Sequence, residues 1–442
     1  MVRKTKKNGT SDKVQVRVSE VSSESLPWRL IRAVNGMKPK VVEPSGAHWT
    51  VPVEAAPASG NIFELPHPNR AAWQDPAELK QRIVVPWHFA SPELQERIEV
   101  ISDVEEMVRA GEWDNILTLL RDLDQTRHRT NSGSRSYQTA LLAARSAVTR
   151  NLSDISRRDT AIHALEALKA MQADHAGDYV AAVIVGRALM DFGWAERGGE
   201  SGQATPAGLA AFRACFNEAE AILAEFDPIE NDSPMLAEAR YLLAPGIDGG
   251  VTFLRDWYAD WADLDPTNPA MLETHSRYLM PQWYGTYDEV AHEAQAAADR
   301  ASDTIGAGAY TYFWLTPLSR EEGLARLDAD LFMKGVHEIL GQSGDQQLAN
   351  LFAAKLYRLG HRSRGRARRS AKKVSAVRAR LATGFEEVVK FHLREIQTMH
   401  WSTDDAGIRL ALGRVFVDDI QKGAIVRPGS GGLEAGYTAN LD

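Results

Sequence analysis

The chain is nearly free of cysteine. Its 442 residues contain only Cys215, so no disulfide can form within the chain and no cysteine-based zinc site is available. Phe212, Ala214 and Phe216 lie around this cysteine in a helical pattern. The context favours a small buried thiol over a reactive one.

Long apolar runs are also missing. No stretch approaches 18 uninterrupted apolar residues, so we expect no membrane-spanning helix. Four of the first seven residues are cationic, but polar residues follow where a signal peptide would have its apolar core. We therefore expect a cytoplasmic protein. The net charge of −8 and the pI near 5.9 argue against general coating of nucleic acid, although they allow a local basic patch.

The usual motifs of catalysis and cofactor binding are absent. The glycine-rich stretches at 246–250 and 341–344 follow no strand and lack the Gly-Lys-Ser/Thr of a phosphate loop, so we predict turns between helices. No Gly-x-Ser-x-Gly elbow occurs. His392 and Glu395 lie one helical turn apart, and three aspartates at 256–263 lie beside tryptophans. Both patterns are more typical of solvated or core-edge helix faces. We predict no catalytic residue, no cofactor and no metal ion.

Proline sets the N-terminal part of the chain apart. Ten of the 19 prolines lie before residue 93 and break any helical period there. We predict a flexible tail at 1–60 and, at 61–100, a proline-rich arm that packs on the body through its aromatic residues. Residues 13–18 read Lys-Val-Gln-Val-Arg-Val, an alternation typical of a strand, but they have no obvious partner strand. This segment is expected to dock on the body or to pair with another chain.

Helical patterns begin at Ser91, which is predicted to cap a helix that starts with Pro92. Interruptions of the pattern recur at regular distances. Two Asp-Pro linkers, at 227 and 265, lie 38 positions apart, and two further helix starts, at 233 and 268, lie 35 apart. A period of this length with two helices per unit is typical of a helical solenoid. We place these repeats at 101–345.

One unit supports a named resemblance. Residues 264–269 form a proline-containing linker, a helix follows, and Gly285 and Tyr287 then open a second helix that carries Ala294 and Ala297. This stretch resembles a tetratricopeptide repeat (TPR), in which small residues let neighbouring helices approach closely. The chain is similar to divergent repeat proteins of an uncharacterised bacterial family. The resemblance implies a scaffold of stacked helix pairs and carries no enzymatic activity with it.

The C-terminal helices, at 346–422, contain the most unusual charge pattern. Residues 346–385 include eleven lysines or arginines and no acidic residue. This basic segment is expected to bind nucleic acid or another anionic surface, to dock on the acidic repeats, or to be a solvated linker. Residues 423–442 are predicted to be a flexible, glycine-rich tail. The nine candidate partner-binding cations within 362–380 are Arg362, Arg364, Arg366, Arg368, Arg369, Lys372, Lys373, Arg378 and Arg380.

Aromatic residues concentrate at 310–314, too densely for one buried helix face. Packing between helices is the favoured interpretation. Tyr310 and Tyr312 are nevertheless candidates for a concave surface that binds a partner.

These observations predict an all-α fold, namely a TPR-like α-solenoid of helix hairpins with a proline-rich arm and a basic C-terminal segment. The favoured function is a non-catalytic scaffold that binds a protein or peptide partner. Binding of nucleic acid or an anionic surface through 362–380 is the alternative, and a helical enzyme with an unrecognised site is the third. The partner's identity and the oligomeric state stay open.

Overall fold

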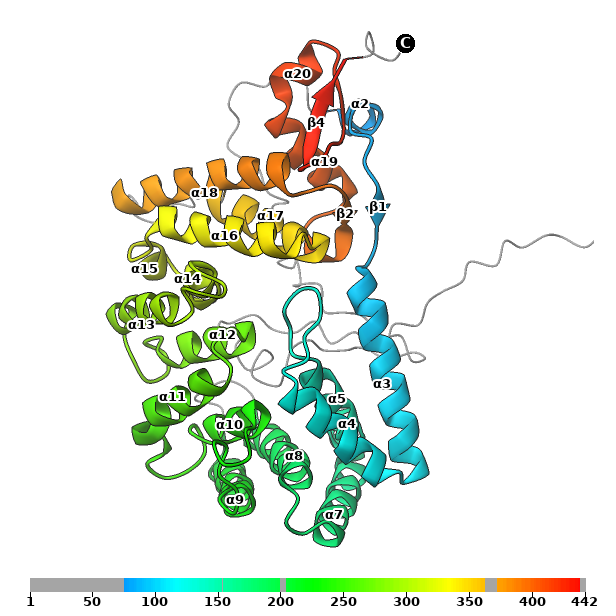
Figure 1. Ribbon diagram of the computed structural model, residues 1–442, viewed down its shortest axis with the longest axis vertical. Helices are drawn as coiled ribbons and strands as arrows, with labels where there is room; N and C mark the ends of the chain where they lie inside the picture. The colour runs from blue at the N-terminus through cyan, green and yellow to red at the C-terminus, as the bar shows by residue number, and fades with distance from the viewer. Residues whose placement is uncertain (1–74, 153, 199–203, 362–371, 438–442) are drawn as a thin grey trace, which may run out of the picture.

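The computed structural model describes residues 75–152, 154–198, 204–361 and 372–437, so the predicted tail at 1–60 lies outside the described residues. Most of the described residues are helical, as predicted (Figure 1). In chain order the helices are α2 (Pro76–Arg82), α3 (Pro92–Ala110), α4 (Trp113–Gln125), α5 (Ser136–Ala144), α6 (Ser146–Thr149), α7 (Arg158–Asp174), α8 (Tyr179–Arg197), α9 (Pro206–Leu223), α10 (Pro234–Tyr241), α11 (Leu254–Leu264), α12 (Pro269–Tyr278), α13 (Tyr287–Arg300), α14 (Gly308–Trp314), α15 (Glu321–Leu324), α16 (Ala329–Ser343), α17 (Gln346–Gly360), α18 (Lys372–Phe391), α19 (Asp405–Val415) and α20 (Val417–Gln421).

Two small sheets accompany these helices. Strand β1 (Trp87–His88) pairs in parallel with β2 (Ile396–Gln397), and β3 (Ile425–Pro428) pairs antiparallel with β4 (Leu433–Gly436). Neither sheet exceeds two strands among the residues described, which confirms the all-α class. No helix in these ranges is long and apolar enough to cross a membrane.

The helix starts at the recurring linkers are confirmed, because each is fixed by a local side-chain cap. The Ser91 hydroxyl accepts a hydrogen bond from the Leu94 N–H at 3.2 Å. Ser233 caps α10 in the same way at 3.0 Å, and the Asn268 side chain caps α12 at 3.1 Å. Each capping residue precedes a proline, whose fixed backbone angle suits the first position of a helix.

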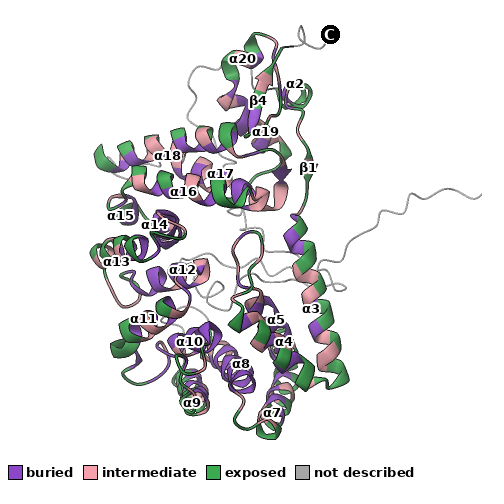
Figure 2. Cartoon of the chain, viewed as in Figure 1, coloured by how far each residue is buried: buried purple, intermediate pink, exposed green. Residues whose placement is uncertain are grey.

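Consecutive helices pack against one another along an arc (Figure 1). The most extensive contacts join α8 with α9, α17 with α18, and α14 with α16. Figure 2 shows that α8 is buried nearly all round, and its residues from Tyr179 to Gly193 are all buried. A helix that is apolar on every face needs neighbours on every side, so α8 forms the centre of the lower core.

The two ends of the arc meet. Helix α3 runs from the lower helices toward the C-terminal ones (Figure 1). The hydroxyl of Ser91, at its start, donates a hydrogen bond to the Gln347 side chain of α17. The β1–β2 pair joins the same two regions. In a linear solenoid each unit contacts only its neighbours, whereas here residues about 250 positions apart are bonded, so the helices close into a ring.

A buried ion pair also ties distant segments together. Arg135 directly precedes α5. Its Nε–H donates to Asp265 at 2.6 Å, and both side chains are almost fully buried. The same guanidinium donates to Thr267 at 2.9 Å. The α4–α5 connection is thereby fixed to the linker that precedes α12.

Gly285 lies in the turn between α12 and α13, as the repeat pattern predicts. A Cβ atom at this position would lie 2.6 Å from the Leu279 carbonyl oxygen, so the turn has room only for glycine. Tyr287 packs against the core but is only partly buried. The larger anchor is Tyr278, which is 4% exposed and stacks on Tyr241 with ring centroids 5.5 Å apart.

The structure corrects the prediction of a flexible C-terminal tail. Residues 423–437 are not a flexible tail, because β3 and β4 form a hairpin whose Val426 and Leu433 are buried. The glycine-rich stretch is its turn, closed by a hydrogen bond of 2.7 Å from the Gly429 N–H to the Gly432 carbonyl. Within the predicted arm at 61–100, α3 begins at Pro92, as the Ser91 cap predicts.

Candidate functional site

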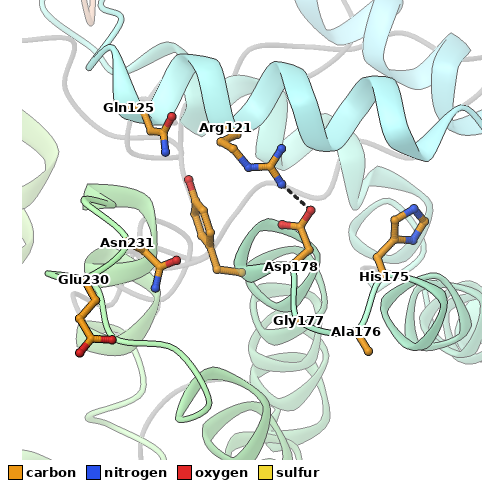
Figure 3. Close-up of a pocket in the computed structure, with 9 residues that line it drawn as sticks. Arg121, Gln125, His175, Ala176, Gly177, Asp178, Glu230 and Asn231 are labelled. Carbon is orange, nitrogen blue, oxygen red and sulfur yellow. Dashed lines mark hydrogen bonds and ion pairs between the residues drawn. The ribbon is translucent and has the colours of Figure 1, made fainter.

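A cleft of about 580 Å³ opens between three segments of the helical body (Figure 3). One wall is the C-terminal half of α4, a second is the turn between α7 and α8, and the third is the loop that precedes α10. Most of the lining side chains are polar. They are Arg121, Gln125, His175, Ala176, Gly177, Asp178, Tyr179, Glu230 and Asn231.

The α7–α8 turn orients the charged groups of the cleft. Gly177 adopts a φ of +89°, which side chains rarely tolerate, and the chain there turns into α8. Asp178 caps α8 by accepting the Val180 N–H at 2.9 Å, and its other oxygen pairs with Arg121. One carboxylate therefore fixes both the helix start and the guanidinium (Figure 3).

His175 places its imidazole ring on the same wall of the cleft. Its Nδ1 lies 2.9 Å from the Met171 carbonyl oxygen, and its Nε2 lies 3.0 Å from an Asp114 carboxylate oxygen. The Met171 carbonyl, and then the Asp114 carboxylate, raise the pKa of His175 because both accept hydrogen bonds from the protonated ring. These contacts favour a cationic imidazole beside the cleft.

A buried carboxylate is bonded to one of the residues that line the cleft, Tyr179. Asp124 is fully buried and accepts hydrogen bonds from the Ser233 hydroxyl at 2.5 Å, the Met235 N–H at 2.8 Å and the Tyr179 hydroxyl at 3.1 Å. Burial raises the pKa of Asp124 to about 6, and the three hydrogen bonds offset only part of that effect. Asp124 thus joins α4, α8 and the start of α10 at one point.

Two strained residues hold the rims of the cleft together. Arg127 and Asp232 have φ of 49° and 47°, a left-handed conformation that is uncommon for residues other than glycine. Their side chains form an ion pair with each other. Arg127 lies two residues after Gln125, and Asp232 directly follows Asn231, so the pair fixes the spacing between these two lining residues. Strain of this kind is often kept where a site needs a fixed geometry.

The chemistry of the lining suits binding by hydrogen bonds and charge. Gln125 and Glu230 are exposed, and Asn231 is partly exposed. Amide side chains donate and accept at once, as a peptide backbone does. No serine, threonine or cysteine lines the cleft. Across the ranges that the structure covers, no group of three or more His, Cys, Asp or Glu is arranged to hold a metal ion.

The predicted basic segment is only partly described. Lys372 and Lys373 are exposed at the start of α18. Arg378 donates to the Leu359 carbonyl oxygen at 3.1 Å and pairs with Glu321 of α15 at 3.3 Å. Five of the nine cations lie outside the described residues, and these are Arg362, Arg364, Arg366, Arg368 and Arg369.

Arg380 is also paired within the chain. Its Nε–H donates to Asp330 of α16 at 2.7 Å, and its Nη1 lies 3.1 Å from Glu387 of α18. The positive charges at 378 and 380 are therefore neutralised by acidic residues of α15, α16 and α18.

The two candidate tyrosines lie inside the body. Tyr310 is 4% and Tyr312 7% exposed, and the Tyr310 hydroxyl accepts the Asp328 N–H at 3.0 Å. Their burial corrects the expectation that they line a partner surface, because α14 packs between α12, α13 and α16. The favoured interpretation, packing between helices, holds for both rings.

His392 and Glu395 are not brought together on one site. His392 Nε2 lies 2.9 Å from Nδ1 of His337, whose Nε2 lies 3.0 Å from Glu387, whereas Glu395 faces His88 at 3.7 Å. The spacing in the sequence gave no indication of His337, which comes from another helix.

The cleft itself was not found in the sequence. Its lining comes from residues 121–125, 175–179 and 230–231, which share no motif and converge only through packing. The one local signal is the Gly-Asp pair before α8, which marks a turn and a helix cap. Comparisons with protein families, with curated proteins and with solved structures find no match to this chain.

Proposed function

We propose that this protein is a non-catalytic interaction scaffold, built as a TPR-like stack of helix hairpins, that binds an extended peptide segment of a partner protein in the cleft described above. The observation that carries the proposal is the cleft itself, whose walls come from three successive parts of the helical body. The resemblance of residues 264–297 to a tetratricopeptide repeat is in keeping with it. The cytoplasm is the proposed location.

The lining matches what an extended peptide offers. A peptide in this conformation presents backbone donors and acceptors that its own secondary structure does not use. Gln125 and Asn231 can bond such groups from opposite rims (Figure 3). Arg121 and Asp178 are already oriented by each other, so the site is largely formed before a ligand arrives. A preformed site loses little side-chain freedom on binding, which favours affinity.

Photo-crosslinking followed by affinity measurement tests this proposal. A benzoylphenylalanine placed at Glu230 should attach to one polypeptide of the native host at a defined segment. The synthetic peptide of that segment should bind the unmodified protein with 1:1 stoichiometry. Crosslinks that spread over many unrelated polypeptides would contradict a specific peptide site.

Matched glutamine variants localise the binding. Gln125→Ala should weaken the peptide about 2- to 12-fold, the loss of one hydrogen bond worth about 0.5–1.5 kcal/mol. Gln421→Ala changes an exposed glutamine of α20, outside the cleft, and should leave the affinity unchanged. Equal affinities of both variants and the wild type would show that the peptide binds elsewhere.

The ion pairs of Arg378 and Arg380 bear on the nucleic-acid alternative. Both cations already face acidic side chains of this chain. For these two residues, the observation supports docking on the protein's own acidic helices rather than binding of an external anion.

A further inference from the structure

The charged side chains of the cleft differ in whether they already have a partner. Arg121 pairs with Asp178 (Figure 3). The His175 ring lies 3.0 Å from a carboxylate oxygen of Asp114, which offsets the charge of the protonated imidazole. Glu230 differs from both. Its N–H donates to Asp227 at 3.0 Å, but within the part of the chain that the structure describes its carboxylate forms no ion pair and accepts no hydrogen bond.

The cleft therefore has an excess of negative charge. With a protonated His175, the lining residues and the bonded Asp114 contribute two cations and three carboxylates. A neutral His175 would make the excess larger, so the sign of the charge does not depend on this ring. The carboxylate without a partner is that of Glu230, at the rim formed by the loop before α10 (Figure 3).

The cations near this loop do not neutralise the rim. Arg127 is paired with Asp232, and Arg240 lies 4.0 Å from Asp227. Burial raises the pKa of Asp260 on α11, and the carboxylate of Asp227 raises it further, although Arg240 acts in the opposite direction. The potential around this wall is thus negative, which attracts a ligand of positive charge.

We propose that the segment bound in the cleft is basic, and that one of its lysine or arginine side chains pairs with Glu230. This inference rests on the proposed peptide-binding function and adds the charge of the ligand. Asn231, the next residue, bonds the backbone of the segment, while Glu230 selects the side chain beside it. Ile229, directly before Glu230, is 50% exposed, so the apolar stem of a lysine or arginine also finds an apolar group at this rim.

The exposure of Glu230 sets the size of the effect. An ion pair between exposed groups is screened by water and changes an affinity by no more than about 5-fold. Glu230 therefore selects among peptides and steers their approach, and the hydrogen bonds of the cleft supply most of the affinity. Because the loss is this small, a crosslinking residue at position 230 still reports on the segment that binds there.

A positional-scanning hexapeptide library tests the charge preference. The peptides have acetylated and amidated ends, so that side chains supply their only charges. At one position, the wild type should bind lysine or arginine about 2- to 5-fold more tightly than norleucine, which keeps the apolar stem without the charge. Glu230→Gln should remove this preference, and Glu230→Arg should shift it to glutamate. Glu225→Gln removes an exposed carboxylate of the same connection, outside the cleft lining, and should keep the wild-type preference.

The outcomes separate this inference from the proposed function. If Gln125→Ala weakens the peptides, but the preference for lysine is absent or persists in Glu230→Gln, the cleft binds peptides without selecting a basic residue and the inference is wrong. If no hexapeptide binds, or binding ignores Gln125→Ala, the peptide-binding function itself fails and the inference fails with it. A preference that Glu230→Gln removes and Glu225→Gln keeps supports the basic ligand.

Discussion

Loss of the Arg135–Asp265 ion pair should loosen the contact between the segment before α5 and the linker that precedes α12. The change is Asp265→Ala, which leaves a guanidinium that is almost completely buried without its main acceptor. Only the Thr267 hydroxyl at 2.9 Å and the more distant Gly133 carbonyl would still accept hydrogen bonds from it. Breaking a buried ion pair on one side costs about 3–5 kcal/mol, because the remaining charge stays buried and unpaired.

The effect is measurable by urea unfolding and by hydrogen exchange. Asp265→Ala should lower the free energy of unfolding by about 3–5 kcal/mol. It should also speed exchange both before α5 and before α12, the two segments that the pair joins. Asp263→Ala serves as the control, since the Asp263 side chain is exposed two residues earlier, at the end of α11, and its loss should cost less than about 0.5 kcal/mol.

A double replacement shows whether the cost of Asp265→Ala comes from the single charge that it leaves buried and unpaired. Arg135→Met with Asp265→Leu removes both charges and keeps apolar volume, so it should recover most of the lost stability. If Asp265→Ala costs no more than Asp263→Ala, the pair does not hold the segments together. The closed ring would then rest on the α3–α17 contact and the β1–β2 pair.

Two further predictions concern the core. Asp124 has a pKa of about 6 in the folded protein against an ordinary value of 3.8, so the folded state binds the proton more tightly. Its contribution to stability is therefore complete below pH 4 and is lost as the pH rises through 6. The destabilisation caused by Asp124→Asn should be larger at pH 4 than at pH 7 by up to about 3 kcal/mol, and urea midpoints that differ equally at both values would contradict this. Tyr278→Ala should cost about 3–5 kcal/mol and the half-buried Tyr287→Ala about half of that, which thermal unfolding can compare; the reverse order would mean that Tyr287 is the anchor of the repeat.

Local features of the fold were predictable because their causes are local. Ser91, Ser233 and Asn268 each cap a helix within three residues of their own position, so the sequence around them contains the whole interaction. Gly285 is similar, since its tight turn excludes a side chain through a carbonyl six residues away. The helical class and the spacing of the linkers follow from interactions of this kind, between residues a few positions apart.

Features that depend on distant partners were missed. The β3–β4 hairpin was mistaken for a tail because the glycines of its turn resemble a linker when the burial of Val426 is unknown. Arg135 and Asp265 lie 130 positions apart, and nothing near either residue indicates the other. The three segments that line the cleft are also brought together by long-range packing, so composition and periodicity could not have located the cleft.

Direct links between segments distant in the sequence explain why the cleft can be both polar and well defined. In an open stack, the α4 wall and the loop before α10 would be joined only through the intervening helices, and small displacements at each contact would add up. Here the Arg127–Asp232 pair and the Asp124 carboxylate connect these two segments directly. The Arg135–Asp265 pair adds a further connection, between the segment before α5 and the linker that precedes α12. Because the first two links join the α4 wall directly to the loop before α10, the rims of the cleft are fixed without the apolar lining that usually keeps a pocket in shape.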